Sequence, residues 1–311
     1  MEVTPDVATV FAHSVAEWQR RMEEVDDDHW DRPTPCADWD VRALVNHVVG
    51  EQRWVVPLLA GRTIAEVDET LDGDLLGPAP HETAASAAKD AVAAMSETGA
   101  TERTVHLSFG DTSAAEYAWQ LVADHVVHGW DLAVAVGADP HIDHDLVVRC
   151  AHWWEGWEEG YRSAGAVGPR VPLSPSASRQ DRLIASFGRD PGWSPVHAVV
   201  SRFGAAWEAW DMAAVVAMLA PDAVFESTGP APDGRRIEGR DAIRAEWEAM
   251  DAATRDPSFL FEEVVVAGER AVARWRFGWA NDDGSPGHVR GVDVLKVVDG
   301  QVAEKLSYVK G

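Results

Sequence analysis

Residues 121–132 read LVADHVVHGWDL, and this stretch decides how the first half of the chain is interpreted. Apolar residues recur at spacings of three and four from Trp119 to Val136 with no proline between them, so the pattern predicts a helix. On such a helix Asp124 and His128 lie one turn apart on one face. A carboxylate oxygen and an imidazole nitrogen can then point at one spot.

A second pair is also available, because His125 and His128 are three residues apart and can share a face. Either pair supplies half of a metal site of the oxygen and nitrogen kind that suits zinc or a similar divalent ion. The missing ligand must come from elsewhere, and the best candidate is His47 in the stretch LVNHVVGE at 44–51. The spacing leaves open whether Asp124 or His125 is the partner of His128.

Two acidic residues lie close in sequence to these candidates. Glu51 follows His47 by one helical turn and is either a further ligand or a solvated helix acid. Asp131, seven residues after Asp124, falls near the same face and either holds a ligand histidine in one tautomer or serves as a polar residue at the helix end. Both residues are therefore alternative or supporting members of the metal site.

Three segments resemble the DinB-like, mycothiol-dependent maleylpyruvate isomerase N-terminal family, in the family's order and over about residues 5–192. They are PTPCADWDVRALVNHVV at 33–49, DHVVHGWDL at 124–132, and QDRL at 180–183 followed by FGRDP at 187–191. The resemblance implies a helical bundle that holds a divalent metal by a histidine, an acidic residue and a histidine. Carried over, these ligands are His47, Asp124 and His128, with Asp124 standing where the characterised isomerase has glutamate. It also implies mycothiol as cosubstrate.

The whole chain limits the classes of function that remain. Its 311 residues are enough for two domains, and its formal net charge of −25 argues against nucleic acid or an anionic membrane as partner. The acidic, polar beginning and the lack of a long apolar run predict a cytoplasmic protein without a membrane span. Two cysteines do not make a disulfide framework. Trp153 and Trp157 fit either packing within the bundle or a homodimer face.

The sequence GWSP at 192–195 marks a boundary between an all-α domain at 1–192 and an α+β domain at 195–311. After it, helical patterns precede a short strand and then four strands joined by tight turns, which predicts a helix-covered curved antiparallel sheet. WEAWD at 207–211, LAPDAVF at 219–225 and RGVD at 290–293 resemble the SnoaL-like, nuclear-transport-factor-2-like family. That family implies an apolar cone between helices and sheet.

Aromatic residues alternate along one strand of this second domain. Trp275, Phe277 and Trp279 share one strand face and are expected to line the cone or fill it. Arg290 and Asp293 are the polar candidates for the same pocket.

These predictions combine into one leading hypothesis, a zinc-dependent transferase or isomerase that uses mycothiol on a small organic molecule. The alternative is a metal-stabilised protein that binds or sequesters a small molecule in the second domain without catalysis.

Overall fold

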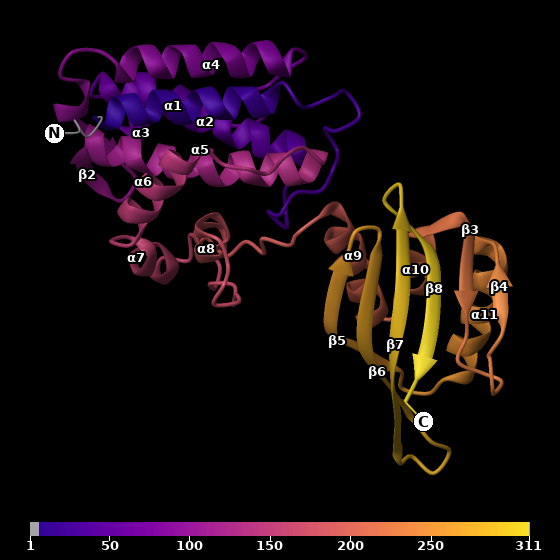
Figure 1. Cartoon of the computed structure of the whole chain (residues 1–311). Helices are drawn as coiled ribbons and strands as arrows, with labels where there is room; N and C mark the ends of the chain where they lie inside the picture. The colour runs from indigo at the N-terminus through magenta and orange to yellow at the C-terminus, as the bar shows by residue number, and fades with distance from the viewer. Residues whose placement is uncertain (1–5, 311) are drawn as a thin grey trace. The chain divides into compact units, whose positions relative to one another are not determined.

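The computed structural model describes residues 6–310, so residues 1–5 of the expected first domain and Gly311 of the second lie outside it. The described chain forms two compact units, and the division between them falls between Trp193 and Ser194. The first is helical, and the second is a helix-covered sheet, as Figure 1 shows. Both parts of the expected fold class are confirmed.

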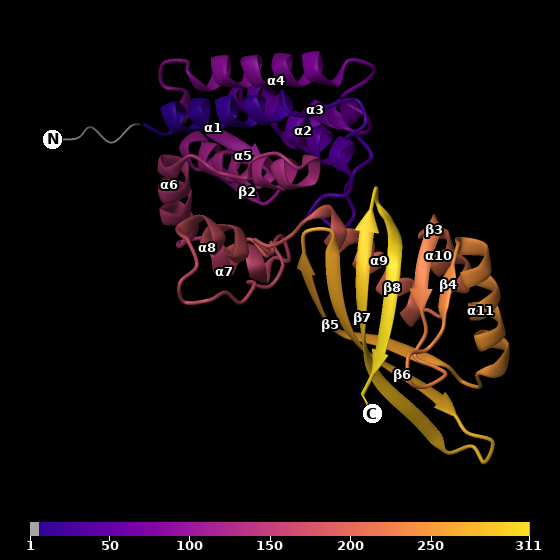
Figure 2. The ribbon, with the colours of Figure 1, turned by 45° about the vertical axis from the view of Figure 1, so that its right-hand side comes forward.

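Four long helices make the body of the first unit, and they run alongside one another in both views (Figures 1 and 2). They are α1 (Val7–Met22), α2 (Val41–Leu59), α4 (Pro80–Met95) and α5 (Ala114–Val136). The side chains of Asp6, Asp40 and Ser113 each accept a hydrogen bond from the first turn of α1, α2 and α5, so local sequence fixes where these helices begin.

Short elements complete the first unit. They are α3 (Ile64–Val67), η1 (Asp68–Leu71), η2 (Ala100–Glu102), α6 (His144–Trp154), α7 (Glu158–Ser163), α8 (Arg179–Ser186) and a hairpin of β1 (Thr104–Leu107) with β2 (Gly110–Ser113). A turn at 155–157 separates α6 from α7.

Helix α5 is the centre of the first unit, because residues on nearly all its sides are buried. Leu121, Val122 and Val126 pack into one apolar cluster with α1 and α2, while Leu132 and Ala135 pack into a second cluster around Trp18. Side chains that point from α5 toward its neighbours therefore lie in a largely dry interior. Polar groups on this helix need partners there.

The second unit is a six-stranded sheet with three helices, α9 (Pro195–Glu208), α10 (Met212–Ala217) and α11 (Arg240–Ala253), on one face (Figure 2). The sheet order is β4-β3-β8-β7-β6-β5. The strands are β3 (Leu219–Glu226), β4 (Arg236–Glu238), β5 (Ser258–Ala267), β6 (Arg270–Ala280), β7 (Pro286–Val298) and β8 (Gln301–Val309). All pairs are antiparallel except β3 with β8, which is parallel.

One irregularity in this sheet controls which β8 side chains face the helices. Lys296 pairs with Glu304, but the next residue, Val297, pairs with Val302, so Ala303 is an extra residue in β8. Such a bulge reverses the alternation of faces beyond it. Val302 and Lys305 are consequently both buried, although they are three residues apart. Within residues 6–310, no helix is long and apolar enough to cross a membrane.

Candidate metal centre

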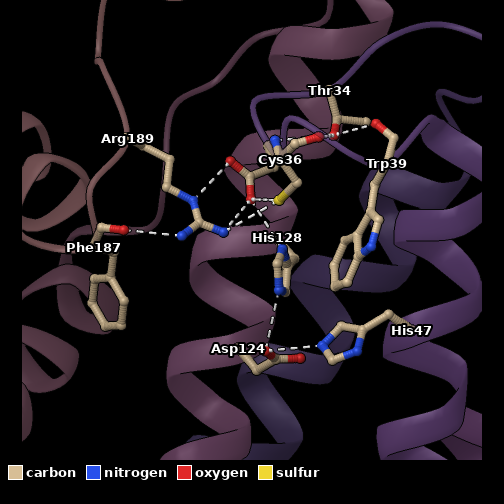
Figure 3. Close-up of polar contacts among 9 residues, drawn as sticks. Thr34, Cys36, Trp39, His47, Asp124, His128, Phe187 and Arg189 are labelled. Carbon is tan, nitrogen blue, oxygen red and sulfur yellow. Dashed lines mark hydrogen bonds and ion pairs between the residues drawn. The ribbon is translucent and has the colours of Figure 1, made fainter. Parts of the chain in front are cut away.

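His47 on α2 meets Asp124 and His128 on α5, as Figure 3 shows. Asp124 Oδ1 lies 3.4 Å from Nε2 of His47 and 3.3 Å from Nε2 of His128. One potential ligand atom from each residue lies within 4.8 Å of the other two. The helical spacing puts Asp124 and His128 on one face of α5, and the packing of α2 against α5 brings His47 to them.

The donor atoms present suit a divalent metal. Asp124 Oδ2 is buried and has no hydrogen-bond partner among the described residues, which is costly for a carboxylate oxygen. Two imidazole nitrogens and one carboxylate form a common three-ligand set for zinc with an open position. The unpartnered oxygen and the converging nitrogens therefore fit a metal ion at this point.

A chain of polar groups contacts His128 at Nδ1, the ring nitrogen that faces away from Asp124. Its Nδ1 donates to Oδ2 of the fully buried Asp131, at 2.9 Å. Asp131 in turn forms an ion pair with Arg189, at 3.2 Å, and Arg189 also donates to Cys36 Sγ, at 3.3 Å. In the neutral ring, with its one proton on Nδ1, the imidazole presents an unprotonated Nε2 toward Asp124 and can bind a metal there.

The electrostatics of the cluster follow from its burial and its opposite charges. Burial alone would raise the pKa of Asp124, but the charges of His128 and His47 hold it well below the ordinary value. Burial would lower the pKa of His128, but Asp124 raises it well above the ordinary value. The pKa of His47 is raised by Asp124 in the same way, against burial. The cluster thus attracts positive charge, either protons or a cation.

His125 points away from this cluster. Its Nδ1 lies 3.1 Å from Ser14 Oγ, and its Nε2 lies 3.1 Å from Nε2 of Gln52. Ser14 Oγ donates to the carbonyl of Phe11, so it accepts from His125, and His125 accepts from the Gln52 amide. Burial lowers the pKa of His125 to about 4. Both ring nitrogens are used, and of the two residues it is Asp124 that contacts His128.

A hollow of about 850 Å³ reaches the three candidate ligands, and Glu51 and Tyr117 line it beside them. Burial, followed by the charge of Asp124, raises the pKa of Glu51 to about 7. Tyr117 has a buried hydroxyl with no partner among the described residues. The outer wall of the hollow is aromatic, with Trp153, Tyr161 and Phe187. The hollow offers room for a small organic molecule next to the cluster.

Sequence reasoning gave Arg189 and Cys36 no part in this site, although both lie within its resembling segments. Arg189 is 58 residues after Asp131, and only the fold brings the two side chains together. Cys36, His128 and Asp131 also lie close enough to form an alternative ligand group, as do Asp26, Asp28 and His29 elsewhere in the first unit.

The second unit contains its own cavity, of about 290 Å³, between the helices and the sheet. Trp275 and Phe277 line it. Asp293 is fully buried beneath the lining residues Lys305 and Ser307, at 2.8 Å and 2.7 Å. Sequence reasoning gave those two residues no role.

Two residues assigned to this pocket from sequence lie elsewhere. Arg290 is an odd number of residues from Asp293, so it points to the opposite sheet face, where it pairs with Glu262. Trp279 lies further along β6, where its indole nitrogen donates to Asn281, and it lines a different hollow with Thr254 and Arg255. The polar residues that line the cavity are Ser227, Thr228, Glu246, Lys305 and Ser307, and Asp293 supports the last two from beneath.

Residues 11–133 match the model of the mycothiol maleylpyruvate isomerase N-terminal domain, and residues 200–305 match the SnoaL-like domain. The chain joins these two families. The first match contains His47, Asp124 and His128 but ends before α8, so Arg189 lies beyond it. The second contains Trp275, Asp293 and Lys305.

Individual proteins resemble one part or the other. An uncharacterized protein of Mycobacterium tuberculosis is 32% identical over 171 residues, which cover 50% of this chain and 83% of that protein. An NTF2-like protein of unknown function from Mesorhizobium loti is 40% identical, covering 37% of this chain and 91% of that chain with a TM-score of 0.33. A putative polyketide cyclase from Pseudomonas putida is 22% identical over 37% of this chain and 91% of its own, with a TM-score of 0.31.

Proposed function

We propose that the protein is a zinc-dependent enzyme that uses a thiol, mycothiol in the cell, for a transfer or isomerisation reaction on a small organic molecule. The observation that carries this proposal is the carboxylate of Asp124 beside an aromatic-walled hollow: its Oδ1 contacts two histidine nitrogens, while its buried Oδ2 has no partner among the described residues. The mycothiol family match supports the choice of thiol.

Each residue has a distinct part in this function. His47, Asp124 and His128 would hold the metal, and Asp131 with Arg189 keeps the His128 ring oriented. Zinc, when bound, supplies a Lewis acid that favours ionisation of a thiol at neutral pH. Glu51, whose pKa is raised by burial to about 7, can accept or return a proton within the hollow. Trp153, Tyr161 and Phe187 give that space an aromatic wall.

Metal content and thiol binding test the proposal without knowledge of the substrate. Protein grown with zinc should contain about one equivalent per chain, and His128→Ala should contain none. His125→Gln, adjacent to the cluster but facing Ser14 and Gln52, should retain the metal. Loss of zinc in His125→Gln but not in Asp124→Ala would show that the ligand assignment is wrong.

Cobalt in place of zinc provides a direct signal for the thiol. Added mycothiol should produce a near-ultraviolet thiolate-to-cobalt charge-transfer band. Because Cys36 lies near His128, the measurement belongs in a Cys36→Ser background, so that the band reports the added thiol. Bound cobalt without such a band would rule out thiol use at this metal.

A second candidate function is supported by the cavity of the SnoaL-like unit. In that reading the protein binds or sequesters a small molecule there, and the metal only stabilises the bundle. Consumption of thiol during turnover separates the two, because a binding protein consumes none.

A further inference from the structure

Lys305 on β8 places an ammonium group at the wall of the second unit's cavity, which is the cone expected from sequence. The residue is 7% exposed, and its Nζ lies 2.8 Å from Asp293 Oδ2 and 2.8 Å from Ser307 Oγ. Ser307 donates in turn to Asp293 Oδ1, at 2.7 Å. Nζ also lies 5.2 Å from the centre of the Phe225 ring and 5.8 Å from that of Trp207.

These contacts leave the ammonium with unused donor capacity. An ammonium has three N–H donors, and its polar partners among the described residues are Ser307 and Asp293. The other side of Nζ faces aromatic rings that line a cavity of about 290 Å³. A polar group at the wall of an apolar pocket is the usual means of orienting a ligand.

The walls of this cavity are mainly aromatic rings. Trp207, Trp210, Trp247, Phe259, Trp275 and Phe277 all line it. The indole nitrogens of Trp207 and Trp275 are buried and have no partner among the described residues, so they are further donors without an acceptor. The volume suits a molecule of one or two fused rings, at the lower end of the range for ligand pockets.

The charges around the cavity determine the charge of its ligand. Two charged residues line it within the described chain, Lys305 and Glu246. Each already has an opposite partner, Asp293 for the lysine and Arg235 for the glutamate. An anion would therefore add an unbalanced charge to an apolar space, which is unfavourable.

We propose that the cone binds a small, planar, uncharged aromatic molecule with an acceptor oxygen, such as an aryl ketone, and that Lys305 donates a hydrogen bond to that oxygen. This inference concerns the second unit and is independent of the metal centre. Lys305 is then the residue that selects ligands with an acceptor oxygen over hydrocarbons of equal shape.

Three probes of one shape test this selection by calorimetric titration of the full-length protein. They are 2-acetylnaphthalene, which has an uncharged acceptor, 2-ethylnaphthalene, which has none, and 2-naphthoate, which is an anion. The ketone should bind about tenfold or more tightly than the hydrocarbon, because its hydrogen bond is to a charged donor. It should also bind more tightly than the naphthoate.

The variants assign the selection to Lys305. Lys305→Met should bind the ketone and the hydrocarbon with nearly equal affinity. Since this change leaves Asp293 buried without its cation, the double variant Lys305→Met/Asp293→Asn provides the same test without an unpaired charge. Lys296→Met, the same substitution on the outer side of β7, is the control and should keep the wild-type preference.

Each other outcome overturns the proposal. Equal affinity of the wild type for ketone and hydrocarbon would show that Lys305 does not contact the ligand, and tightest binding of naphthoate would refute the charge argument. If the folded double variant still prefers the ketone over the hydrocarbon, the hydrogen-bond donor is a residue other than Lys305. Failure of all three probes to bind would show that the cone does not take a ligand of this class.

Discussion

Replacing Asp131 by asparagine should weaken zinc binding about 10- to 100-fold, which corresponds to about 1.4–2.7 kcal/mol. The carboxylate accepts from His128 Nδ1 and Arg189 Nη2 through Oδ2, and from Arg189 Nε through Oδ1. An amide keeps one acceptor oxygen and presents a donor in place of the other. Arg189 cannot lose its protons, so its donors compete with His128 for the single oxygen.

The consequence for the metal comes from the imidazole tautomer. Once Nδ1 faces an amide N–H, it is favoured as an acceptor, and the proton then belongs on Nε2. That nitrogen is the one directed at Asp124, 3.3 Å away. Zinc must displace this proton and reorient the ring, which accounts for the loss in affinity.

Competition with a fluorescent zinc chelator at fixed pH measures the effect. Asp111→Asn is the matched control, because Asp111 also contacts a histidine Nδ1, that of His106 at 2.7 Å, but lies on the exposed hairpin. The control should bind zinc as the wild type does. Wild-type affinity in Asp131→Asn, with the fold intact by circular dichroism, would refute the idea that Asp131 prepares His128 for a metal.

Two further predictions concern stability and domain structure. Burial lowers the pKa of His125 to about 4, so the unfolded chain binds a proton between about pH 6.5 and 4 that the folded chain does not, and stability should fall by up to about 3 kcal/mol as pH falls through this window. Urea unfolding in a metal chelator should show a shallower acid decline for His125→Gln, and equal slopes would contradict the assignment. Residues 1–193 and 194–311, expressed separately, should each unfold cooperatively in urea, because each has its own apolar core. Two insoluble fragments would count against this prediction.

The helical half of the fold was accessible from sequence because its signals are local. The apolar spacing of α5 and the capping residues Asp40 and Ser113 predict helices without knowledge of their neighbours. The candidate metal site was less accessible. Spacing alone could not choose between Asp124 and His125, because i,i+3 and i,i+4 pairs are both neighbours on a helix. The choice requires knowing that Ser14 and Gln52 engage the His125 ring.

The cone shows a different limit of sequence reasoning. In a regular strand with Val302 buried, Lys305 would be on the opposite face, exposed to solvent. The extra residue at Ala303 turns it inward, and a bulge of this kind has no reliable sequence pattern here. Arg290 and Trp279 were misplaced for related reasons. The position of Arg290 depends on which residues of β7 face the helices, and Arg290 is on the other face. The position of Trp279 depends on where the cavity ends along β6.

The hydrogen bonds of His125 fix how α5 is rotated about its axis, although His125 lies outside the cluster of His47, Asp124 and His128. Its two ring nitrogens join α5 to Ser14 on α1 and Gln52 on α2 in the dry interior, so turning α5 by one residue, about 100°, would break both contacts. Asp124 precedes His125 and His128 follows it by three residues, so their directions are fixed with it. These hydrogen bonds among three helices thus hold Asp124 and His128 toward His47 without an ion. We expect variants of Ser14 or Gln52 to disturb the positions of the three candidate ligands although neither residue belongs to the cluster.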